Sequence, residues 1–247
     1  MRRHHFLLLF FLLVSLPSVV AQTPDSDETE ASYGLSASVD HKLAKGLHLE
    51  GEAELRMLSG FGDMERWALS LGIDYKLLSW LKADAGYAFI NRYKTSKVTN
   101  AGNVRNGFWS PRHRWYGSLS GSYDIGRWSW SLRERYQYTY APLQYVPKYT
   151  PAGKRLTDEA EAGTHEHLLR SRLAVSYNIR HSKFEPEASI EFHNDLSRGF
   201  SLDEIRYVCS LDYKLSKVQT FSLTFRYTDN RDDDDATVLL VGYSYKF

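Results

Sequence analysis

The feature that most constrains the fold is a period-two alternation of apolar and polar residues that recurs along nearly the whole chain. In one segment, Leu47, Leu49 and Leu55 alternate with Glu50 and Glu54. Successive side chains of a β-strand point to opposite faces, so such a segment has one apolar and one polar surface. Segments of this form occupy residues 33–40, 47–57, 67–76, 81–93, 112–125, 128–140, 168–179, 184–193, 205–215, 220–229 and 236–247. Most are about ten residues or slightly longer, which is the length of a tilted membrane-spanning strand.

The connections between these segments distinguish a membrane barrel from a soluble β-sandwich, which the alternation alone also fits. Short links at 44–46, 78–80, 126–127, 180–183 and 216–219 alternate strictly with long links at 58–65, 94–111, 141–166, 194–202 and 230–235. Outer-membrane barrels have tight turns at one rim and longer loops at the other. The sequence therefore predicts an all-β fold, a transmembrane antiparallel outer-membrane β-barrel of about 12 strands.

The strand count leaves the role of residues 22–32 open. Eleven segments are clear, whereas single-chain bacterial barrels usually have an even number of strands. A further strand within 141–166 is disfavoured by Pro147 and Pro151 and would break the alternation of link lengths. Residues 22–32 are therefore expected either to form a weak twelfth crossing or to thread through the lumen.

The first residues have the order of a secretory signal peptide. Arg2 and Arg3 precede an apolar run from Phe6 to Leu16, and small residues follow up to a cleavage site predicted after Ala21. The apolar run is too short for a membrane-spanning helix, which needs about 20 residues. We expect a signal peptide at 1–21, a polar N-terminal segment at 22–32 and the barrel at 33–247, in the outer membrane of a Gram-negative bacterium.

Charge and cysteine content exclude several classes of protein. The chain has 31 basic and 30 acidic residues, and removal of Arg2 and Arg3 leaves 29 against 30. This balance argues against a nucleic-acid-binding protein. Cys209 is the only cysteine, so an internal disulfide is excluded; because it falls on an apolar strand face, it is expected to be an inert small hydrophobe.

Charged residues on the polar faces are predicted to line the lumen. The register across short turns sets Ser118 and Ser120 level with Arg135 and Arg133, and it sets Arg172 level with Glu191 as an expected cross-strand ion pair. Two interpretations stay open, a salt-bridged structural lumen and a narrow channel with an arginine track that prefers anions. The predicted lumen-lining residues are Glu50, Glu52, Glu54, Arg133, Arg135, Arg170, Arg172, Glu185, Glu187, Glu191, Arg206 and Arg226.

The sequence contains no phosphate-binding glycine loop, zinc motif or nucleotide fingerprint, and we expect no cofactor. The best local cluster for a surface lipid- or glycan-modifying hydrolase is His193, Asn194 and Asp195 with Ser197, which a polar loop explains as well. His165 and His167 are a weak metal signal. The run Asp232–Asp235 could bind Ca²⁺ or Mg²⁺, but a solvated loop tip is the favoured interpretation. We therefore predict a non-enzymatic barrel, with a hydrolase or a loop-mediated binding protein as alternatives. Glu134 falls on an apolar face and has no explanation from sequence.

The expected partners follow from the predicted location. They are outer-membrane lipid and lipopolysaccharide, and the barrel-assembly machinery through the C-terminal strand that ends in Phe247. Aromatic residues near both ends of the strands are typical of the two interfacial girdles of a membrane barrel.

Several stretches resemble one family of outer-membrane proteins. They are Glu50–Glu54, Arg66-Trp67, Asp74–Leu77, Trp80–Lys82, Gly86-Tyr87, Pro111–Arg114, Ser131–Tyr140, Leu169–Arg172, Asp212–Lys217 and Gly242–Phe247. The family is the one catalogued as domain of unknown function 2490, known from Bacteroidetes-type bacteria. Tyr136 stands where its members often have tryptophan. The resemblance implies the barrel fold and outer-membrane location, but it implies no activity.

Overall fold

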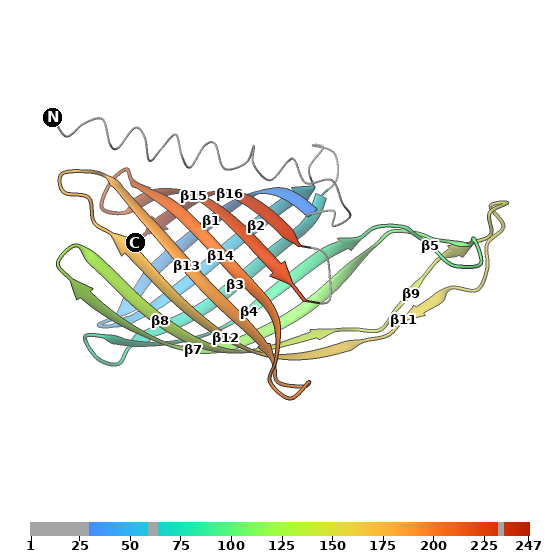
Figure 1. The fold of residues 1–247 in the computed structure, drawn as a ribbon, viewed down its shortest axis with the longest axis horizontal. Coiled ribbons are helices and arrows are strands. Elements are labelled where there is room, and N and C mark those ends of the chain that lie inside the picture. Colours follow the sequence, from blue (N-terminus) through green and yellow to red (C-terminus); the bar gives the residue numbers. More distant parts are fainter. Residues whose placement is uncertain (1–29, 59–63, 232–234) are drawn as a thin grey trace.

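The computed structural model describes residues 30–58, 64–231 and 235–247, and these residues form one closed β-barrel with an arm at one end (Figure 1). The barrel contains eleven strands, so the predicted fold class is confirmed, with one strand fewer than the expected twelve within the described residues. The barrel strands are β1 (Glu30–Ala44), β2 (Leu47–Leu58), β3 (Met64–Lys76), β4 (Leu81–Lys94), β7 (Phe108–Ile125), β8 (Trp128–Ala141), β12 (Thr164–Tyr177), β13 (Phe184–Asp195), β14 (Ser201–Lys214), β15 (Gln219–Asn230) and β16 (Ala236–Lys246).

The barrel closes through a parallel pair, whereas its other neighbours pair antiparallel. Along β1 and β16 the register runs from Glu30 beside Ala236 to Asp40 beside Lys246. Strand direction alternates along the chain, so the first and last members of an odd-numbered set run the same way and meet in parallel. Residues 22–29 of the predicted polar segment and the predicted signal peptide lie outside the described residues.

The connections divide the two rims as the sequence predicts. The links 45–46, 77–80, 126–127, 178–183 and 215–218 all lie at one end, which we call the short-turn rim. Gly46 and Gly126 have φ angles of 79° and 65° in the two tightest turns, a backbone region that glycine adopts without strain. The strand ends that the other five connections join lie at the opposite end, the long-loop rim.

An arm extends beyond the long-loop rim and is built from the two longest connections, residues 95–107 and 142–163 (Figure 1). It contains β5 (Lys97–Val98), β6 (Val104–Arg105), β9 (Gln144–Val146), β10 (Lys148–Tyr149) and β11 (Glu159–Glu161). These short strands pair as β10-β6-β5 and β11-β9, outside the barrel, so the region around Pro147 and Pro151 contributes no barrel strand. The link pattern alone did not predict this local sheet structure.

Ion pairs hold the arm together where its two connections meet. Glu161 accepts hydrogen bonds from Lys94 Nζ at 2.5 Å and Arg105 Nη1 at 2.7 Å, and Lys148 Nζ lies 2.9 Å from Glu159. Val146, the register partner of Glu159, is 1% exposed. The arm is therefore an ordered element with its own small packed centre.

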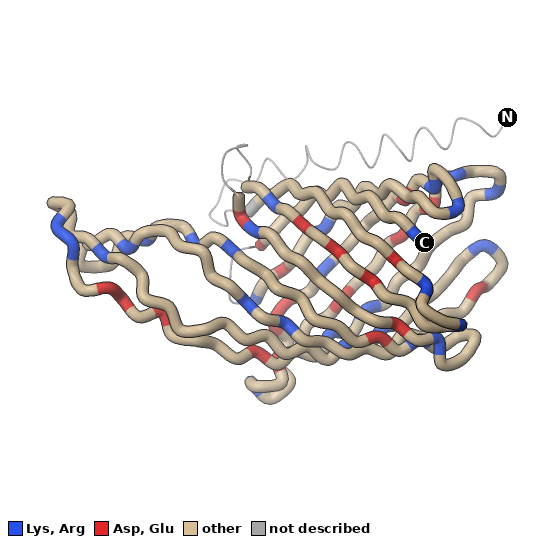
Figure 2. The backbone as a smooth tube through the Cα atoms, turned by 180° about the vertical axis from the view of Figure 1, so that it is seen from behind, with Lys and Arg blue, Asp and Glu red and all other residues tan. Residues whose placement is uncertain are grey.

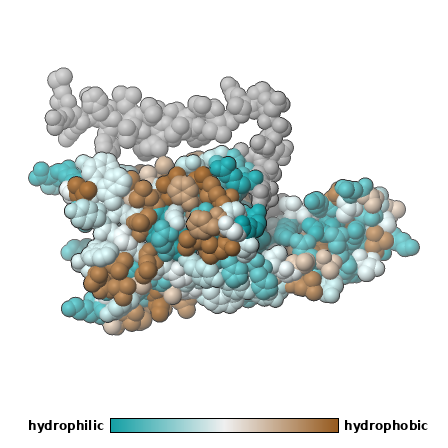
Figure 3. All heavy atoms as spheres, turned by 60° about the horizontal axis from the view of Figure 1, so that its bottom comes forward, coloured by the Kyte–Doolittle hydropathy of each residue, from teal (hydrophilic) through white to brown (hydrophobic). Residues whose placement is uncertain are grey.

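The barrel wall is apolar on its outward face and polar within. Leu69, Leu71 and Ile73 follow one another on the outward face of β3 and are each more than half exposed. The only cluster of buried apolar residues within the described part is small, formed by Ala68, Ala88 and Ile90. Apolar residues gather on the outside of the barrel, whereas the arm is largely hydrophilic (Figure 3). No helix in the described residues is both long and apolar enough to cross a membrane.

Candidate functional site

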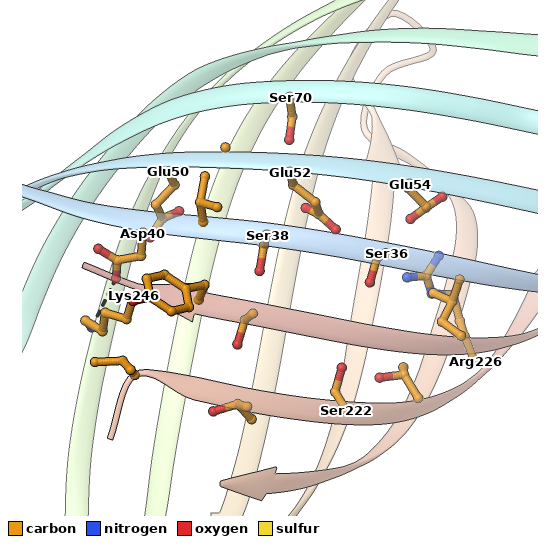
Figure 4. Close-up of a pocket in the computed structure, with 18 of the residues that line it drawn as sticks. Ser36, Ser38, Asp40, Glu50, Glu52, Glu54, Ser70, Ser222, Arg226 and Lys246 are labelled. Atoms are coloured by element: carbon orange, nitrogen blue, oxygen red, sulfur yellow. Dashed lines mark ion pairs between the residues drawn. The ribbon is translucent and has the colours of Figure 1, made fainter. Parts of the chain in front are cut away.

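The lumen collects the charged residues on the inward strand faces. Glu50, Glu52, Glu54 and Arg226 line its main cavity (Figure 4), and Arg135 and Arg170 line a smaller one. The remaining predicted residues lie on the same strand faces, in contact with charged neighbours: Arg133 with Glu191, Arg172 with Glu187, Arg206 with Glu204, and Glu185 with Lys214.

The main cavity has a volume of about 590 Å³ and lies against β1, β2, β15 and β16. Its lining begins with Asp40, Lys217 and Lys246 near the short-turn rim and includes a row of small hydroxyl side chains (Figure 4). A second cavity of about 150 Å³ continues toward Arg66, Arg114 and Arg170. The two cavities share four lining residues, namely Glu52, Glu54, Ser70 and Tyr116. The two cavities therefore adjoin along one side of the lumen, and we call this pair of cavities the polar path.

Tyr116 marks the junction between the cavities, and two glycines fix its position. Gly72 pairs with Gly86, and Gly86 pairs with Tyr116, in one row across β3, β4 and β7. A Cβ atom on Gly72 would stand 2.9 Å from the Tyr116 hydroxyl, so the phenol lies across both glycines. The guanidinium of Arg135 lies 4.1 Å from the centre of the same ring, within the range of a cation–π contact.

Arg135 is further held by the small residues beside it, as the expected register requires. Ser118 is the register partner of Arg135, and Ser120 that of Arg133. Arg135 Nε donates to Ser118 Oγ at 2.8 Å, Ser118 donates to Asp84 at 2.8 Å, and Arg135 Nη2 lies 3.0 Å from Asp84. This closed triangle fixes the guanidinium against the wall.

Glu191 is the centre of the largest ionic network in the described lumen. It is 4% exposed and accepts hydrogen bonds from Arg133 at 2.6 Å and from Arg170 Nε at 3.0 Å. The register prediction for Arg172 and Glu191 agrees with the structure, but the expected ion pair between them is wrong. Arg172 binds Glu187 instead, at 2.5 Å, because Arg133 and Arg170 already occupy Glu191.

His193 belongs to this network. The sequence instead suggested that it forms a surface cluster with Asp195 and Ser197. It is 1% exposed, with Nε2 lying 2.6 Å from Glu191 and Nδ1 lying 2.6 Å from Glu204. Asp195 instead accepts hydrogen bonds from Arg198 and from the backbone of Ser197. The predicted His193–Asp195–Ser197 cluster is therefore not assembled as a unit, since the histidine faces two carboxylates.

The half of the lumen toward the long-loop rim carries an arginine belt, composed of Arg56, Arg66, Arg114, Arg170, Arg206 and Arg226. These six side chains come from six different strands. They are close enough for their like charges to repel one another. Glu54 pairs with Arg56 and Arg66 at 2.8 and 2.9 Å. Seen from behind, both acidic and basic positions are spread over the barrel strands (Figure 2).

Two belt arginines have no close counter-charge. Among the described residues, no carboxylate lies within ion-pair distance of Arg114 or Arg226; Arg114 Nε donates only a long hydrogen bond of 3.4 Å to Thr139. Sequence reasoning predicted Arg170, Arg206 and Arg226 but missed Arg56, Arg66 and Arg114. Their alternation on inward faces was a usable signal for all three.

The remaining residues singled out from sequence lie outside the lumen. Glu134 is on the outward face, where it accepts a hydrogen bond from Ser171 Oγ at 2.6 Å. Cys209 is a free cysteine on the outward face of β14. His165 and His167 each contact a tyrosine, and the described residues contain no cluster of three or more metal-ligating side chains. Of the acidic run, only Asp235 is described, and it accepts a hydrogen bond from Tyr227.

Among the solved structures that resemble this chain, one autotransporter domain supports the barrel fold. The β-domain of the Bordetella autotransporter BrkA superposes with a TM-score of 0.57 at 13% identity, covering 83% of this chain and 86% of that one. The NanC porin superposes with a TM-score of 0.48 at 13% identity, covering 87% and 98%. No curated protein matches the sequence. The family described as protein of unknown function (DUF2490) matches residues 34–238, and the chain therefore belongs to this family.

Proposed function

We propose that this protein is a non-enzymatic β-barrel of the bacterial outer membrane whose lumen is a narrow channel that prefers anions. The membrane location is supported by the exposed apolar outward face, by the outer-membrane-type fold and by the predicted signal peptide. In water such a face would be exposed at a large cost in free energy, since burial of apolar surface is worth about 25 cal/mol per Å². In lipid the same face needs no cover.

The observation that carries the channel proposal is the polar path that leads to an incompletely neutralised arginine belt. The two cavities meet at Glu52, Glu54, Ser70 and Tyr116 and link Lys246 with Arg114. A purely structural lumen would be expected to pair its charges fully, because an unpaired buried charge is costly. Because no described carboxylate pairs with Arg114 or Arg226, their positive charges are available to attract a mobile anion.

The test is ion selectivity in a planar bilayer under a potassium chloride gradient. Arg114→Glu and Arg226→Glu place carboxylates among the other belt arginines, so the double variant is expected to fold with improved local charge balance. Wild type is expected to favour chloride, and the double variant to favour potassium. Lys97→Glu with Arg155→Glu, in the arm, is the matched control with the same change in charge and should keep chloride selectivity.

Two results would contradict the proposal. A refolded wild-type barrel that conducts no current would leave only the structural lumen. A double variant with wild-type selectivity would show that the belt does not act on the permeating ions.

A further inference from the structure

The outward face beside the long-loop rim carries a platform of aromatic and histidine rings in two register rows. One row is Tyr87, Trp115, Tyr138 and His167, and the other is Phe89, His113, Tyr140 and His165. Each row takes one ring from each of β4, β7, β8 and β12. Neighbouring strands lie about 4.8 Å apart, so the platform is about 15 Å wide. With Tyr136, these nine residues form what we call the tyrosine–histidine platform.

The rings of the platform contact one another across the strands. Within the first row the ring centres of Tyr87 and Trp115 are 5.4 Å apart, and those of Tyr138 and His167 are 4.8 Å apart. Trp115 and Tyr138, at 5.7 Å, complete that row. Such packing keeps the rings in place even where they are well exposed: Trp115 and Tyr136 are each 45% exposed.

Three hydrogen bonds of one kind fix the histidines. The Tyr87 hydroxyl lies 2.7 Å from His113 Nδ1, Tyr138 lies 2.6 Å from His165 Nδ1, and Tyr136 lies 2.8 Å from His167 Nδ1. A neutral imidazole that accepts at Nδ1 carries its proton on Nε2. No residue that the structure describes bonds to Nε2 of any of the three histidines. In the tautomer in which the tyrosine hydroxyl donates, each histidine keeps an N–H at Nε2 that no described residue uses.

The platform lies at the level of one set of lipid headgroups. Tyr138 is ten residues along β8 from Trp128, which begins the strand at the short-turn rim. Ten residues of a strand tilted by about 40° rise about 25 Å along the barrel axis, close to the height of the apolar band of a membrane barrel. With Trp128 at the inner interface, the two rows therefore reach the outer one.

The opposite interface is built differently. Near the short-turn rim, aromatic rings also pair, as in Trp128 with Tyr177 and Phe184 with Tyr213. Within the described residues, however, tyrosine–histidine hydrogen bonds occur only on the platform. A ring girdle that merely anchors the barrel would need no such asymmetry.

We propose that the tyrosine–histidine platform binds the phosphorylated sugar headgroup of a glycolipid in the outer leaflet. Aromatic faces pack against the apolar faces of sugar rings, and the three Nε2–H donors match phosphate oxygens. The inference rests on the membrane location proposed above, but it is independent of conduction through the lumen. The lumen arginines cannot serve this site, because they lie on the other side of the wall.

The test is lipid retention by the full mature chain, measured by native mass spectrometry after refolding with diphosphoryl lipid A or fully dephosphorylated lipid A. Wild type should retain the diphosphoryl form at least about tenfold better, since even one hydrogen bond to a charged group can support a change of that size. His113→Gln, His165→Gln and His167→Gln together should abolish the preference. The control, His41→Gln near the short-turn rim, should keep it.

A second variant separates histidine positioning from barrel integrity. Tyr136→Phe with Tyr138→Phe retains the rings but frees His167 and His165, and it should lower the preference by several-fold. Bilayer conductance in these variants should remain at the wild-type level. Equal retention of the two lipids by wild type, or an unchanged preference in the histidine triple variant, would overturn the proposal. Failure to associate with any lipid would instead refute the membrane location itself.

Discussion

Tyr116 lies across Gly86, its register partner on the neighbouring strand, and occupies the space in which a side chain at that position would stand. Gly86 has no side chain to pack within the strand, and the Tyr116 ring covers the backbone at that position instead. The ring also lines both lumen cavities, so the glycine sets the position of a side chain that the two cavities share.

Gly86→Ala is therefore expected to destabilise the barrel by about 1–3 kcal/mol, the usual cost of overpacking. The added methyl group would collide with the Tyr116 ring. Gly117→Ala is the matched control, because a Cβ there meets nothing closer than a carbonyl oxygen at 4.0 Å. Urea unfolding of the two variants in lipid vesicles measures the difference. Equal stabilities would contradict the packing described for Tyr116.

Glu191→Gln is expected to cost about 3–5 kcal/mol of unfolding free energy, the range for removing one partner of a buried ion pair. The substitution leaves Arg133, Arg170 and His193 without their shared carboxylate. Glu187 binds only Arg172 and its side chain is 37% exposed, so Glu187→Gln should cost less than about 1 kcal/mol. The same urea titration compares both; a larger loss for Glu187→Gln would refute the central role of Glu191.

The arm is expected to lose order in acid. The hydrogen bond from Lys94, together with the charge of Arg105, lowers the pKa of Glu161 below its ordinary value of 4.5. A carboxyl group with a lowered pKa in the folded state contributes its full stabilisation above pH 4.5 and loses it as the pH falls through the lowered value. Hydrogen exchange of residues 144–161 should therefore accelerate below pH 4.5, after correction for the intrinsic rate.

Glu161→Gln should remove most of this pH dependence and give fast exchange already at neutral pH. Asp158→Asn, which alters a surface pair with Arg155, is the control and should behave as wild type. Exchange that stays independent of pH in the wild-type arm would exclude the proposed role of the Glu161 ion pairs.

Glu52→Gln is expected to raise the chloride preference of the lumen. Glu52 lines both cavities, and no cation lies within ion-pair distance of it among the described residues. Its charge therefore opposes that of Arg226 and Arg66. Reversal potentials in a chloride gradient should shift toward the chloride equilibrium value. Glu185→Gln, paired with Lys214 near the short-turn rim, should give a smaller shift, and the reverse order would contradict this assignment.

Much of the barrel could be predicted because each strand must have one apolar face and one polar face. A wall with lipid on one side and water on the other forces alternation at every position, so strand ends such as Leu47 and Leu81 could be read from the sequence. The register across a two-residue turn follows from the turn itself, which is why Ser118 and Arg135 were correctly placed opposite each other.

The ionic partners could not be predicted in the same way. Long side chains reach across several strands, so Arg133 on β8 meets Glu191 on β13, two strands away, and Arg172 takes Glu187. Strand register predicts which backbone positions are neighbours. It does not predict where the charged group of a long side chain lies. The arm escaped prediction because the pairing of Lys148 with Arg105 joins two loops that are distant in sequence.

The most direct test of the account is the chemical accessibility of two positions on opposite faces of the wall. Cys209 points outward on β14, and Ser38 lines the main cavity of the lumen (Figure 4). With the protein refolded in lipid vesicles, a water-soluble maleimide should leave Cys209 unmodified and should label Ser38→Cys in a Cys209→Ser background. Rapid labelling of Cys209 in intact vesicles, with Ser38→Cys protected, would contradict the outward apolar and inward polar arrangement on which the proposed channel depends.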